Sequence, residues 1–351
     1  MAEGGNYELF CLGNPLLDIQ GKGDDALLEQ YGLKPNDAIL AESQHLSLYD
    51  ELTQNRDAKL IAGGAAQNSA RGAAYILPQN SVVYVGCVGK DKSAEILKEA
   101  AEKSGLRVEY RYDNEQPTGR CGVIITGYDR SMVTDLAAAN HNKLEHLKSP
   151  EVWKFVEQAK AFYIGGYHLT VCVPAIMALA EHAAENNKVF MLSLSAPFIP
   201  QFFKDQLDAT APYWDYVIGN ETEARSYAAS HALGTEDVTE IAKSMAKLPK
   251  QNTKRPRTVV ITQGTEPTVA AVYKDGAEVE VHTFPVHPID KTKIVDTNGA
   301  GDAFAGGFAA GVVMGRSLEE AMHMGQWLAK LSIQELGPQY PFPKQSYAGE
   351  Y

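Results

Sequence analysis

The residues most able to do chemistry lie between Lys293 and Phe304, where an aspartate follows two closely spaced glycines at the start of an apolar helix. A strand-like run leads into the turn Gly299-Ala300-Gly301, whose glycines let the backbone come close to a ligand. Helix N-termini carry unpaired N–H groups and a partial positive charge, so they bind anions. Asp302 follows in the first helical turn, where its carboxylate could deprotonate an alcohol that attacks the terminal phosphorus of a bound nucleotide.

Two other interpretations of this segment remain open. Gly-x-Gly after a strand is half of the dinucleotide-binding fingerprint, but Phe304 occupies the place of the third glycine and the Asp302 carboxylate would repel a pyrophosphate. Asp302 could also be only a favourable charge in the first turn of a buried helix. The sequence has no Walker A, protein-kinase or Gly-x-Ser-x-Gly motif, so phosphoryl transfer would need a different phosphate cradle.

Two segments in the first fifth of the chain could hold a sugar. In the run Gly13-Asn14-Pro15-Leu16-Leu17-Asp18, the side chains of Asn14 and Asp18 face the same way if the chain is extended. Asp18 could accept two hydrogen bonds from the vicinal hydroxyls of a ribose, or it could bond its own backbone in a turn. Gly64 and Asn68, one helical turn apart, could frame the same sugar, or they could be a glycine turn before an ordinary helix.

Polar residues at other expected strand ends could line a nucleotide and a metal ion. Asn220 and Glu223 have the spacing of a capping box, and the alternative places Glu223 near a Mg²⁺ ion through water. The run Thr262-Gln263-Gly264 is either a turn or a ligand contact at the carboxyl end of a parallel strand. Arg130, at the tip of an expected hairpin, is either solvated or able to close over the transferring phosphoryl group.

The elements that must position these residues alternate along most of the chain. The apolar runs are continuous, as expected for strands covered on both faces, and lie at Leu9–Leu12, Val82–Val88, Phe162–Ile164, Val189–Leu194, Tyr216–Ile218 and Val259–Thr262. Helical patterns lie near 65–77, 92–104, 174–187, 221–230, 237–247, 300–314 and 317–335. This alternation predicts an α/β fold with a mostly parallel central sheet. Three glycines inside the helix near 300–314 predict that its backbone packs closely on a neighbour.

Two segments break this alternation and predict a second domain. Residues 17–60 combine a short helix with the half-polar run Asp37–Glu42. Residues 117–139 have the pattern of a hairpin, with strands at Cys121–Thr126 and Met132–Leu136 joined by residues 127–131. We therefore predict a small discontinuous lid domain of residues 17–60 and 117–139. It covers a large α/β domain of residues 1–16, 61–116 and 140–351.

Composition excludes several classes of partner. The chain has 351 residues with 32 Lys and Arg against 44 Asp and Glu, a formal net charge of −12, so nucleic acid and anionic lipid are not expected ligands. No apolar run is long enough to cross a bilayer, and the first residues do not form a signal peptide. The four cysteines are widely spaced and mostly lie in apolar runs, which predicts buried free thiols. We expect a cytoplasmic protein, with a nuclear share left open, and a monomer.

Taken together, these segments resemble the ribokinase-like carbohydrate kinase family, and within it the adenosine kinases. The family-wide part is the run from Asp296 to Phe304 together with Gly63-Gly64, Asn68 and the pair Asn220 and Glu223. The narrower likeness to adenosine kinases lies in residues 13–18, 114–119, 136–140, 194–199 and 219–224. Because the matches follow in order over nearly the whole chain, the resemblance is more specific than any single motif.

The resemblance implies a three-layer α/β/α sandwich with a small β-sheet lid, and phosphorylation of the adenosine 5′-hydroxyl by ATP with Mg²⁺, a reaction of purine salvage. By position, Asp302 would be the base, Gly299, Ala300 and Gly301 the anion hole, and Arg130 the cover over the phosphates. The implied substrate contacts are Asn14, Asp18, Leu40, Gly63, Gly64, Asn68, Met132, Thr134 and His168. The implied nucleotide contacts are Asn220, Glu223, Thr262, Gln263, Gly264, Asn298 and Gln326, with Glu223 reaching Mg²⁺ through water.

Two departures from the pattern leave base selectivity open: Tyr167-His168 stands where many relatives have a second Phe, and Gln326 stands where relatives can have His. A kinase of the same family acting on another nucleoside or a sugar is the nearest alternative function. A nucleoside-binding regulator without chemistry is disfavoured by the intact Asp302 and glycine cradle, and an NAD-dependent oxidoreductase by Phe304.

Overall fold

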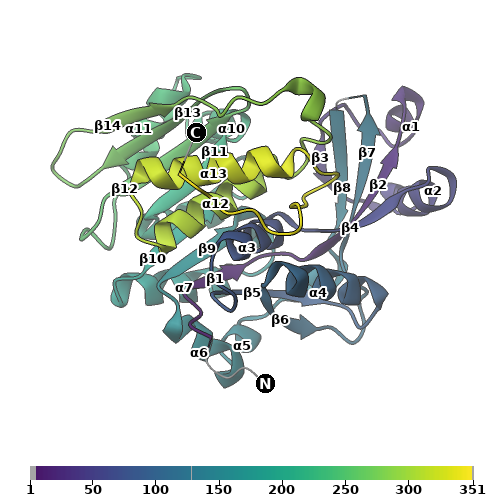
Figure 1. Cartoon of the computed structure of the whole chain (residues 1–351), viewed down its shortest axis with the longest axis horizontal. Coiled ribbons are helices and arrows are strands. Elements are labelled where there is room, and N and C mark those ends of the chain that lie inside the picture. Colours follow the sequence, from purple (N-terminus) through teal and green to yellow (C-terminus); the bar gives the residue numbers. More distant parts are fainter. Residues whose placement is uncertain (1–4, 128, 350–351) are drawn as a thin grey trace.

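The computed structural model describes residues 5–127 and 129–349, and in these ranges the strands form two β-sheets (Figure 1). The larger sheet has nine described strands. In spatial order they are β14 (Glu280–Phe284), β13 (Glu266–Tyr273), β12 (Arg257–Gln263), β11 (Tyr216–Asn220), β10 (Val189–Ser193), β9 (Ala161–Gly165), β1 (Leu9–Leu12), β5 (Val82–Val88) and β6 (Arg107–Tyr112). Neighbours from β6 to β12 are parallel, whereas β13 and β14 extend the edge antiparallel.

The parallel strands are apolar throughout because each contributes to two separate cores. Along β1 every side chain is fully buried. Phe10 and Leu12 belong to one hydrophobic cluster, and Leu9 and Cys11 belong to the cluster on the opposite face. A strand whose successive side chains alternate between two covered faces has no polar face to show in its sequence.

Helices cover both faces of this sheet, which confirms the predicted three-layer α/β/α sandwich. One face is covered by α5 (Leu144–Leu147), α6 (Pro150–Gln158), α7 (Val173–Glu185), α8 (Phe198–Phe202), α9 (Lys204–Thr210), α10 (Glu221–Ser230) and α11 (Val238–Ala246). The other face is covered by α3 (Ala65–Ile76), α4 (Lys92–Ser104), α12 (Ala300–Val313) and α13 (Leu318–Ser332). None of the helices within the described ranges has the length and apolar character that crossing a lipid bilayer requires.

The glycines inside α12 allow its backbone to approach two neighbouring helices, as the sequence predicted. A Cβ atom on Gly306 would lie 2.4 Å from the Ser69 carbonyl oxygen of α3. A Cβ atom on Gly307 would lie 2.5 Å from the Met324 carbonyl oxygen of α13. Since real side chains do not approach backbone atoms so closely, any larger residue would push α12 away from its place between α3 and α13.

The smaller sheet lies beside the large one and carries its own helices (Figure 1). Its described strands, in spatial order, are β3 (Ala38–Leu40), β8 (Asp129–Asp135), β7 (Arg120–Thr126), β2 (Leu16–Lys22) and β4 (Lys59–Gly63). Helices α1 (Asp25–Gln30) and α2 (Leu48–Asn55) bury Leu27, Leu48 and their neighbours against it. The sheet draws on two stretches of chain, residues 16–63 and 120–135, and the domain boundaries proposed from the sequence stay a prediction.

The hairpin of this sheet differs from the sequence prediction. Strand β8 begins at Asp129, which pairs with Thr126, and Arg130 pairs with Ile125 inside the ladder. Arg130 therefore lies in the strand rather than at the hairpin tip. Gly127 has φ +60°, a conformation that suits a tight turn between β7 and β8. Residue 128 of the expected loop lies outside the described residues.

The strand-like run before α12 was also predicted wrongly. Residues Lys291–Lys293 form a short 3₁₀ turn, and the chain from 294 to 299 is irregular. The N–H groups of Val295 and Asp296 both donate to the Ile333 carbonyl oxygen, at 2.9 and 3.3 Å, instead of joining a sheet. Further 3₁₀ turns lie at Ser43–His45, Ala137–His141, Gly166–Thr170 and Ala211–Tyr213.

Candidate active site

A cavity of about 400 Å³ lies between the two sheets, at the carboxyl ends of the parallel strands. Its walls come from the ends of β1, β9 and β11, the first turns of α3 and α12, and strands β2, β3, β7 and β8 of the small sheet. This volume falls in the range of ligand pockets, and the carboxyl edge is where parallel sheets gather their ligands.

The first turn of α12 opens into this cavity. Gly299 is the N-cap residue with φ +79°, and no side chain caps the helix. A Cβ atom on Gly299 would lie 2.5 Å from Pro338, whereas a Cβ atom on Gly301 would meet nothing within 4 Å. The helix therefore presents its N-terminal N–H groups and partial positive charge to the open space, as an anion site requires. Ala300 and Asn298 line the same wall.

Asp302 lies in this turn and is held by α3. Its Oδ2 accepts a hydrogen bond from Asn68 Nδ2 at 2.9 Å, and Oδ1 accepts none from the described residues. Burial raises the pKa of Asp302 to about 7, while the hydrogen bond from Asn68 and the charge of Arg71 act to lower it. The carboxylate is thus fixed through one oxygen, and its other oxygen can receive a proton from a hydroxyl in the cavity.

A second carboxylate, Asp18 of β2, lies across the same cavity and is 7% exposed. Burial, and then the charge of Asp302, raise the pKa of Asp18, and the charge of Arg71 acts in the opposite direction. Gly63 makes room for this side chain, because a Cβ atom there would lie 2.2 Å from Asp18 Oδ1. Gly63 itself does not line the cavity, whereas Gly64, with φ +85° at the N-cap of α3, does.

Arg130 lines the cavity from the small sheet and is tied to the loop before α12. Its Nε donates to Asp296 Oδ1 at 3.2 Å, and Gln20 Nε2 donates to Asp296 Oδ2 at 2.7 Å. Asp296 is 1% exposed, and it also accepts hydrogen bonds from the backbone N–H groups of Asn298 and Gly337. Asp296 therefore ties the small sheet to the loop before α12 and to the backbone at Gly337. Sequence reasoning did not single it out, although it stands in the same acidic and glycine-rich run.

Asn220 and Glu223 also line the cavity, and they form the capping box. Glu223 Oε2 accepts from the Asn220 backbone N–H at 2.9 Å and Oε1 from Asn220 Nδ2 at 3.0 Å. Burial raises the pKa of Glu223 to about 7. The interpretation of this pair as a capping box is confirmed. Because both residues also line the cavity, their contact with a ligand stays a prediction.

The other predicted contacts divide into two groups. Asn14, Leu40, Met132 and Thr134 line the cavity, while Thr262, Gln263, Gly264, Gln326 and His168 do not. The Thr262 hydroxyl bonds the Gly219 carbonyl oxygen, and Gln326 Oε1 accepts from the His287 N–H at 3.1 Å. The nucleotide contacts of Thr262, Gln263, Gly264 and Gln326 and the substrate contact of His168 stay predictions.

His168 lies behind the cavity wall. It is fully buried, and its Nδ1 is 2.7 Å from Asn14 Oδ1. Burial lowers the pKa of His168 to about 3, so the ring is neutral at physiological pH. His168 therefore supports the Asn14 side chain from behind the cavity wall.

Ser195 is a cavity residue that sequence reasoning did not identify as a site. It follows β10 with φ +68°, which is rare for a residue with a side chain, and its Oγ accepts from the Gly166 N–H at 2.8 Å. A strained residue beside a cavity is a common signature of function, but its backbone angle cannot be read from the sequence.

Comparison with known proteins places this geometry in a family. The model of the pfkB family of carbohydrate kinases matches residues 25–345. The chain belongs to this family. It is 49% identical to the adenosine kinase of Schizosaccharomyces pombe over 344 residues, which cover 97% of this chain and 98% of the relative. The family membership and the fold that the sequence resemblance implied are thereby confirmed.

Solved structures agree with this assignment. The adenosine kinase of Anopheles gambiae, in complex with P1,P4-di(adenosine-5) tetraphosphate, superposes with a TM-score of 0.92 at 43% identity, over 95% of this chain and 97% of that one. The adenosine kinase of Schistosoma mansoni, in complex with adenosine and AMP, gives a TM-score of 0.88 at 35% identity, over 97% and 98% of the two chains. The fold is therefore one on which adenosine kinases are built.

Proposed function

We propose that this chain is an ATP-dependent kinase that phosphorylates the 5′-hydroxyl of adenosine and releases AMP and ADP. The observation that carries the proposal is the placement of Asp302, anchored by Asn68, at the uncapped N-terminus of α12 inside a ligand-sized cavity. High identity to adenosine kinases over nearly the full length supports adenosine as the acceptor and ATP as the donor.

The chemistry follows from the positions of these groups. The acceptor hydroxyl gives its proton to Asp302 as its oxygen bonds to the γ-phosphorus, and the bond from that phosphorus to the β,γ-bridging oxygen breaks to release ADP. The turn Gly299-Ala300-Gly301 lines the cavity where charge develops on the phosphoryl oxygens, and the partial positive charge of the α12 N-terminus can stabilise that charge. Within the turn, the Ala300 N–H donates to the Thr297 carbonyl oxygen at 3.2 Å, so the N–H groups of Gly299 and Gly301 are the donors proposed for the phosphoryl oxygens. Arg130, on the opposite wall, can move from Asp296 to the same oxygens, where its planar guanidinium suits two of them at once.

The ribose side of the cavity is formed by Asp18 and Asn14. The buried Asp18 carboxylate faces the cavity without a cationic hydrogen-bond partner among the described residues, so two vicinal hydroxyls can satisfy it. The backbone of Gly64 packs closely against that of Asn14, because a Cβ atom at Gly64 would lie 2.4 Å from the Asn14 carbonyl oxygen. These contacts favour a ribose over an acyclic alcohol.

Mg²⁺ fits this site through water rather than by direct coordination. Both oxygens of Glu223 already accept hydrogen bonds from Asn220, so a bound water is the natural bridge from this carboxylate to a cation. Mg²⁺ retains several waters and binds mainly through substrate phosphates, and when bound it neutralises charge on the β- and γ-phosphates. Glu223 would hold that water, together with Asn220 at the same wall.

A substrate panel tests the function. The protein is incubated with ATP and Mg²⁺ and, separately, adenosine, guanosine, cytidine, ribose and fructose, and the products are identified by mass spectrometry. We expect AMP and ADP in equal amounts from adenosine and little product from the free sugars. A sugar phosphate formed faster than AMP would refute adenosine as the substrate, and ATP hydrolysis without any phosphorylated acceptor would refute the kinase assignment.

A further inference from the structure

Arg71 is a fully buried cation that neither the motifs nor the proposed mechanism uses. It lies on α3, one turn after Asn68, and is 1% exposed. Its Nη2 donates to Asn68 Oδ1 at 3.0 Å and to the carbonyl oxygens of Ala62 and Pro338. Burying a guanidinium is costly unless it is well bonded, and here its described hydrogen-bond partners are neutral oxygens rather than a carboxylate. Its described hydrogen bonds all come from Nη2, and its buried Nε has no hydrogen-bond partner among the described residues.

The hydrogen bond to Asn68 decides which way that amide faces. A primary amide has one acceptor oxygen and one donor nitrogen, and the two ends have nearly the same shape. Since Arg71 can only donate, it selects the amide oxygen, and Asn68 Nδ2 is left facing Asp302 Oδ2 at 2.9 Å. In the reverse orientation, two donors would face each other at Arg71 and two acceptors would face each other at Asp302.

The same guanidinium links the carboxylate to the anion-binding turn. Pro338, whose carbonyl oxygen accepts from Arg71, is the residue against which Gly299 packs. Tyr340, two residues later, donates its hydroxyl to the Asn68 carbonyl oxygen at 3.1 Å. One buried side chain therefore contacts both the helix that anchors Asp302 and the segment that supports the turn before α12.

We propose that Arg71 is a positioning residue for the phosphoryl transfer, which fixes the Asn68 amide so that this amide holds the Asp302 carboxylate. The inference rests on the proposed function and deepens it by adding a group that touches no substrate. The proposal is based on two successive hydrogen bonds, one from Arg71 to Asn68 and one from Asn68 to Asp302.

The charge of Arg71 should influence the pH dependence of activity, which a residue with only a structural role would not do. The guanidinium lies one amide away from Asp302 and lowers the pKa of Asp302 and of Asp18 against the effect of burial. The charged and titratable groups around Asp302, from all elements that face it, are Arg71, Asp18, Glu223, Tyr163, Tyr167 and Tyr340, with Arg130 across the cavity. Among these, Arg71 is the cation whose charge acts on Asp302.

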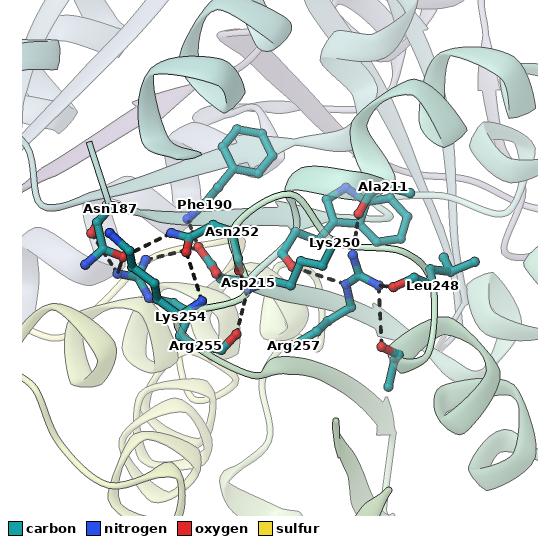
Figure 2. Close-up of polar contacts among 12 residues, drawn as sticks. Asn187, Phe190, Ala211, Asp215, Leu248, Lys250, Asn252, Lys254, Arg255 and Arg257 are labelled. Carbon is teal, nitrogen blue, oxygen red and sulfur yellow. Dashed lines mark hydrogen bonds and ion pairs between the residues drawn. The ribbon is translucent and has the colours of Figure 1, made fainter. Parts of the chain in front are cut away.

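A second buried arginine offers a matched control. Arg257, at the start of β12, is fully buried and donates to the carbonyl oxygens of Trp214, Ala211 and Pro249, at 3.1, 2.7 and 2.9 Å. Figure 2 shows this guanidinium among carbonyl oxygens, with Lys250 and Arg255 beside it on Asp215. It lies at the end of its strand that is opposite the cavity edge. Its replacement should therefore lower stability without touching the site.

The experiment compares Arg71→Met, Arg71→Gln, Arg71→Lys and Arg257→Met with the wild-type protein. For each, kcat and kcat/KM for adenosine are measured from pH 5.5 to 9 with saturating Mg·ATP, together with the melting temperature. We expect Arg71→Met to lose about tenfold or more in kcat, because a carboxylate displaced by a fraction of an ångström loses its alignment. Its acid limb should move to higher pH by about one unit, since removal of a nearby positive charge raises the pKa of a carboxyl group.

The other variants separate the two effects. Arg71→Gln keeps N–H donors but loses the charge, so it should show the shifted acid limb with a smaller loss of kcat. Arg71→Lys keeps the charge and should leave the acid limb in place. Arg257→Met should melt at a lower temperature with an unchanged pH profile.

Several results would overturn the proposal. A folded Arg71→Met variant with the wild-type kcat and pH profile would do so, as would an equal shift of the acid limb in Arg257→Met. If neither neutral variant folds under conditions in which Arg257→Met does, Arg71 acts in folding and not in positioning. If the wild-type protein itself does not phosphorylate adenosine, the proposed function fails instead.

Discussion

Replacing Asp302 by asparagine should greatly lower turnover while stabilising the fold. The amide oxygen can take the place of Oδ2 and still accept from Asn68, so the local structure is preserved. The substituted group can no longer take a proton, and loss of a positioned base typically lowers the rate by about 10²–10⁴-fold, or about 3–5.5 kcal/mol in the barrier. The Kd for adenosine should change by less than about threefold, because the ribose contacts expected of Asp18 remain.

The same substitution should raise the free energy of unfolding. Burial raises the pKa of Asp302 from 3.8 to about 7, so the ionised form is destabilised in the folded protein. For a carboxyl group whose pKa is raised on folding, the cost is present at pH above the folded value and vanishes at pH below the unfolded value. A rise of about three units at about 1.36 kcal/mol per unit sets an upper limit of about 4 kcal/mol on the gain at pH 8.

Three measurements on Asp302→Asn decide this prediction: kcat with saturating substrates, adenosine binding by calorimetry, and unfolding by denaturant at pH 8 and pH 5. The stabilisation should be larger at pH 8 than at pH 5, since the wild-type carboxyl group is protonated at the lower pH. Turnover within tenfold of wild type would refute the assignment of the base. A variant that is less stable than wild type at both pH values would refute the claim that the ionised carboxylate is costly there.

Three further predictions concern the same site. Activity (kcat/KM) should fall as the pH drops below about 7, because Asp302 must be ionised to accept a proton and burial raises its pKa to about that value; a profile flat to pH 5.5 would contradict this. Arg130→Ala should lower kcat by about 10²-fold or more with little change in KM for adenosine, and steady-state kinetics that show the reverse split would argue for a role in nucleoside binding. Gly299→Ala should lower the melting temperature and the activity more than Gly315→Ala does. Both glycines have positive φ, but only at Gly299 would a Cβ atom lie 2.5 Å from Pro338. Equal losses in the two variants would exclude the contact with Pro338 as the cause.

The elements that could be predicted from the sequence were those with a local signal, a pattern of residue types within one short stretch of chain. The strand at Leu9–Leu12 and the helix Glu221–Ser230 match the structure residue for residue, because a continuous apolar run and a capping box are local signals. The edge strands β6 and β14 of the large sheet, and β13 beside β14, were not predicted. Their side chains are partly exposed and mixed in polarity, so their pairing depends on neighbouring strands rather than on their own sequence.

The candidate site was predictable where its residues sit beside a glycine turn. Asp302, Gly64 and Asn68 were identified in this way, and the structure brings all of them to one cavity. Arg71 was not identified, and Asp296 was named only as the first residue of the resembling run, without a role. A single arginine in an Ala-rich helix and one more aspartate carry no local sign of burial. Arg71 is enclosed only when α3 packs against the C-terminal segment, and Asp296 only when the small sheet meets the loop before α12.

The amino-acid sequence by itself determined the alternation of the buried parallel strands with helices, the glycine turn that opens α12, and the presence of a carboxylate in its first turn. These follow from the backbone freedom of glycine and from the spacing of apolar residues, which act over a few positions in the chain. The tertiary structure alone decided that Asn68 anchors Asp302, that Arg130 is bonded to Asp296, and that Asp18 shares their cavity. Hydrogen bonds and charges act through space between residues that are far apart in the chain, such as Asn68 and Asp302, which are 234 positions apart. That separation in sequence hides these contacts until the chain is folded.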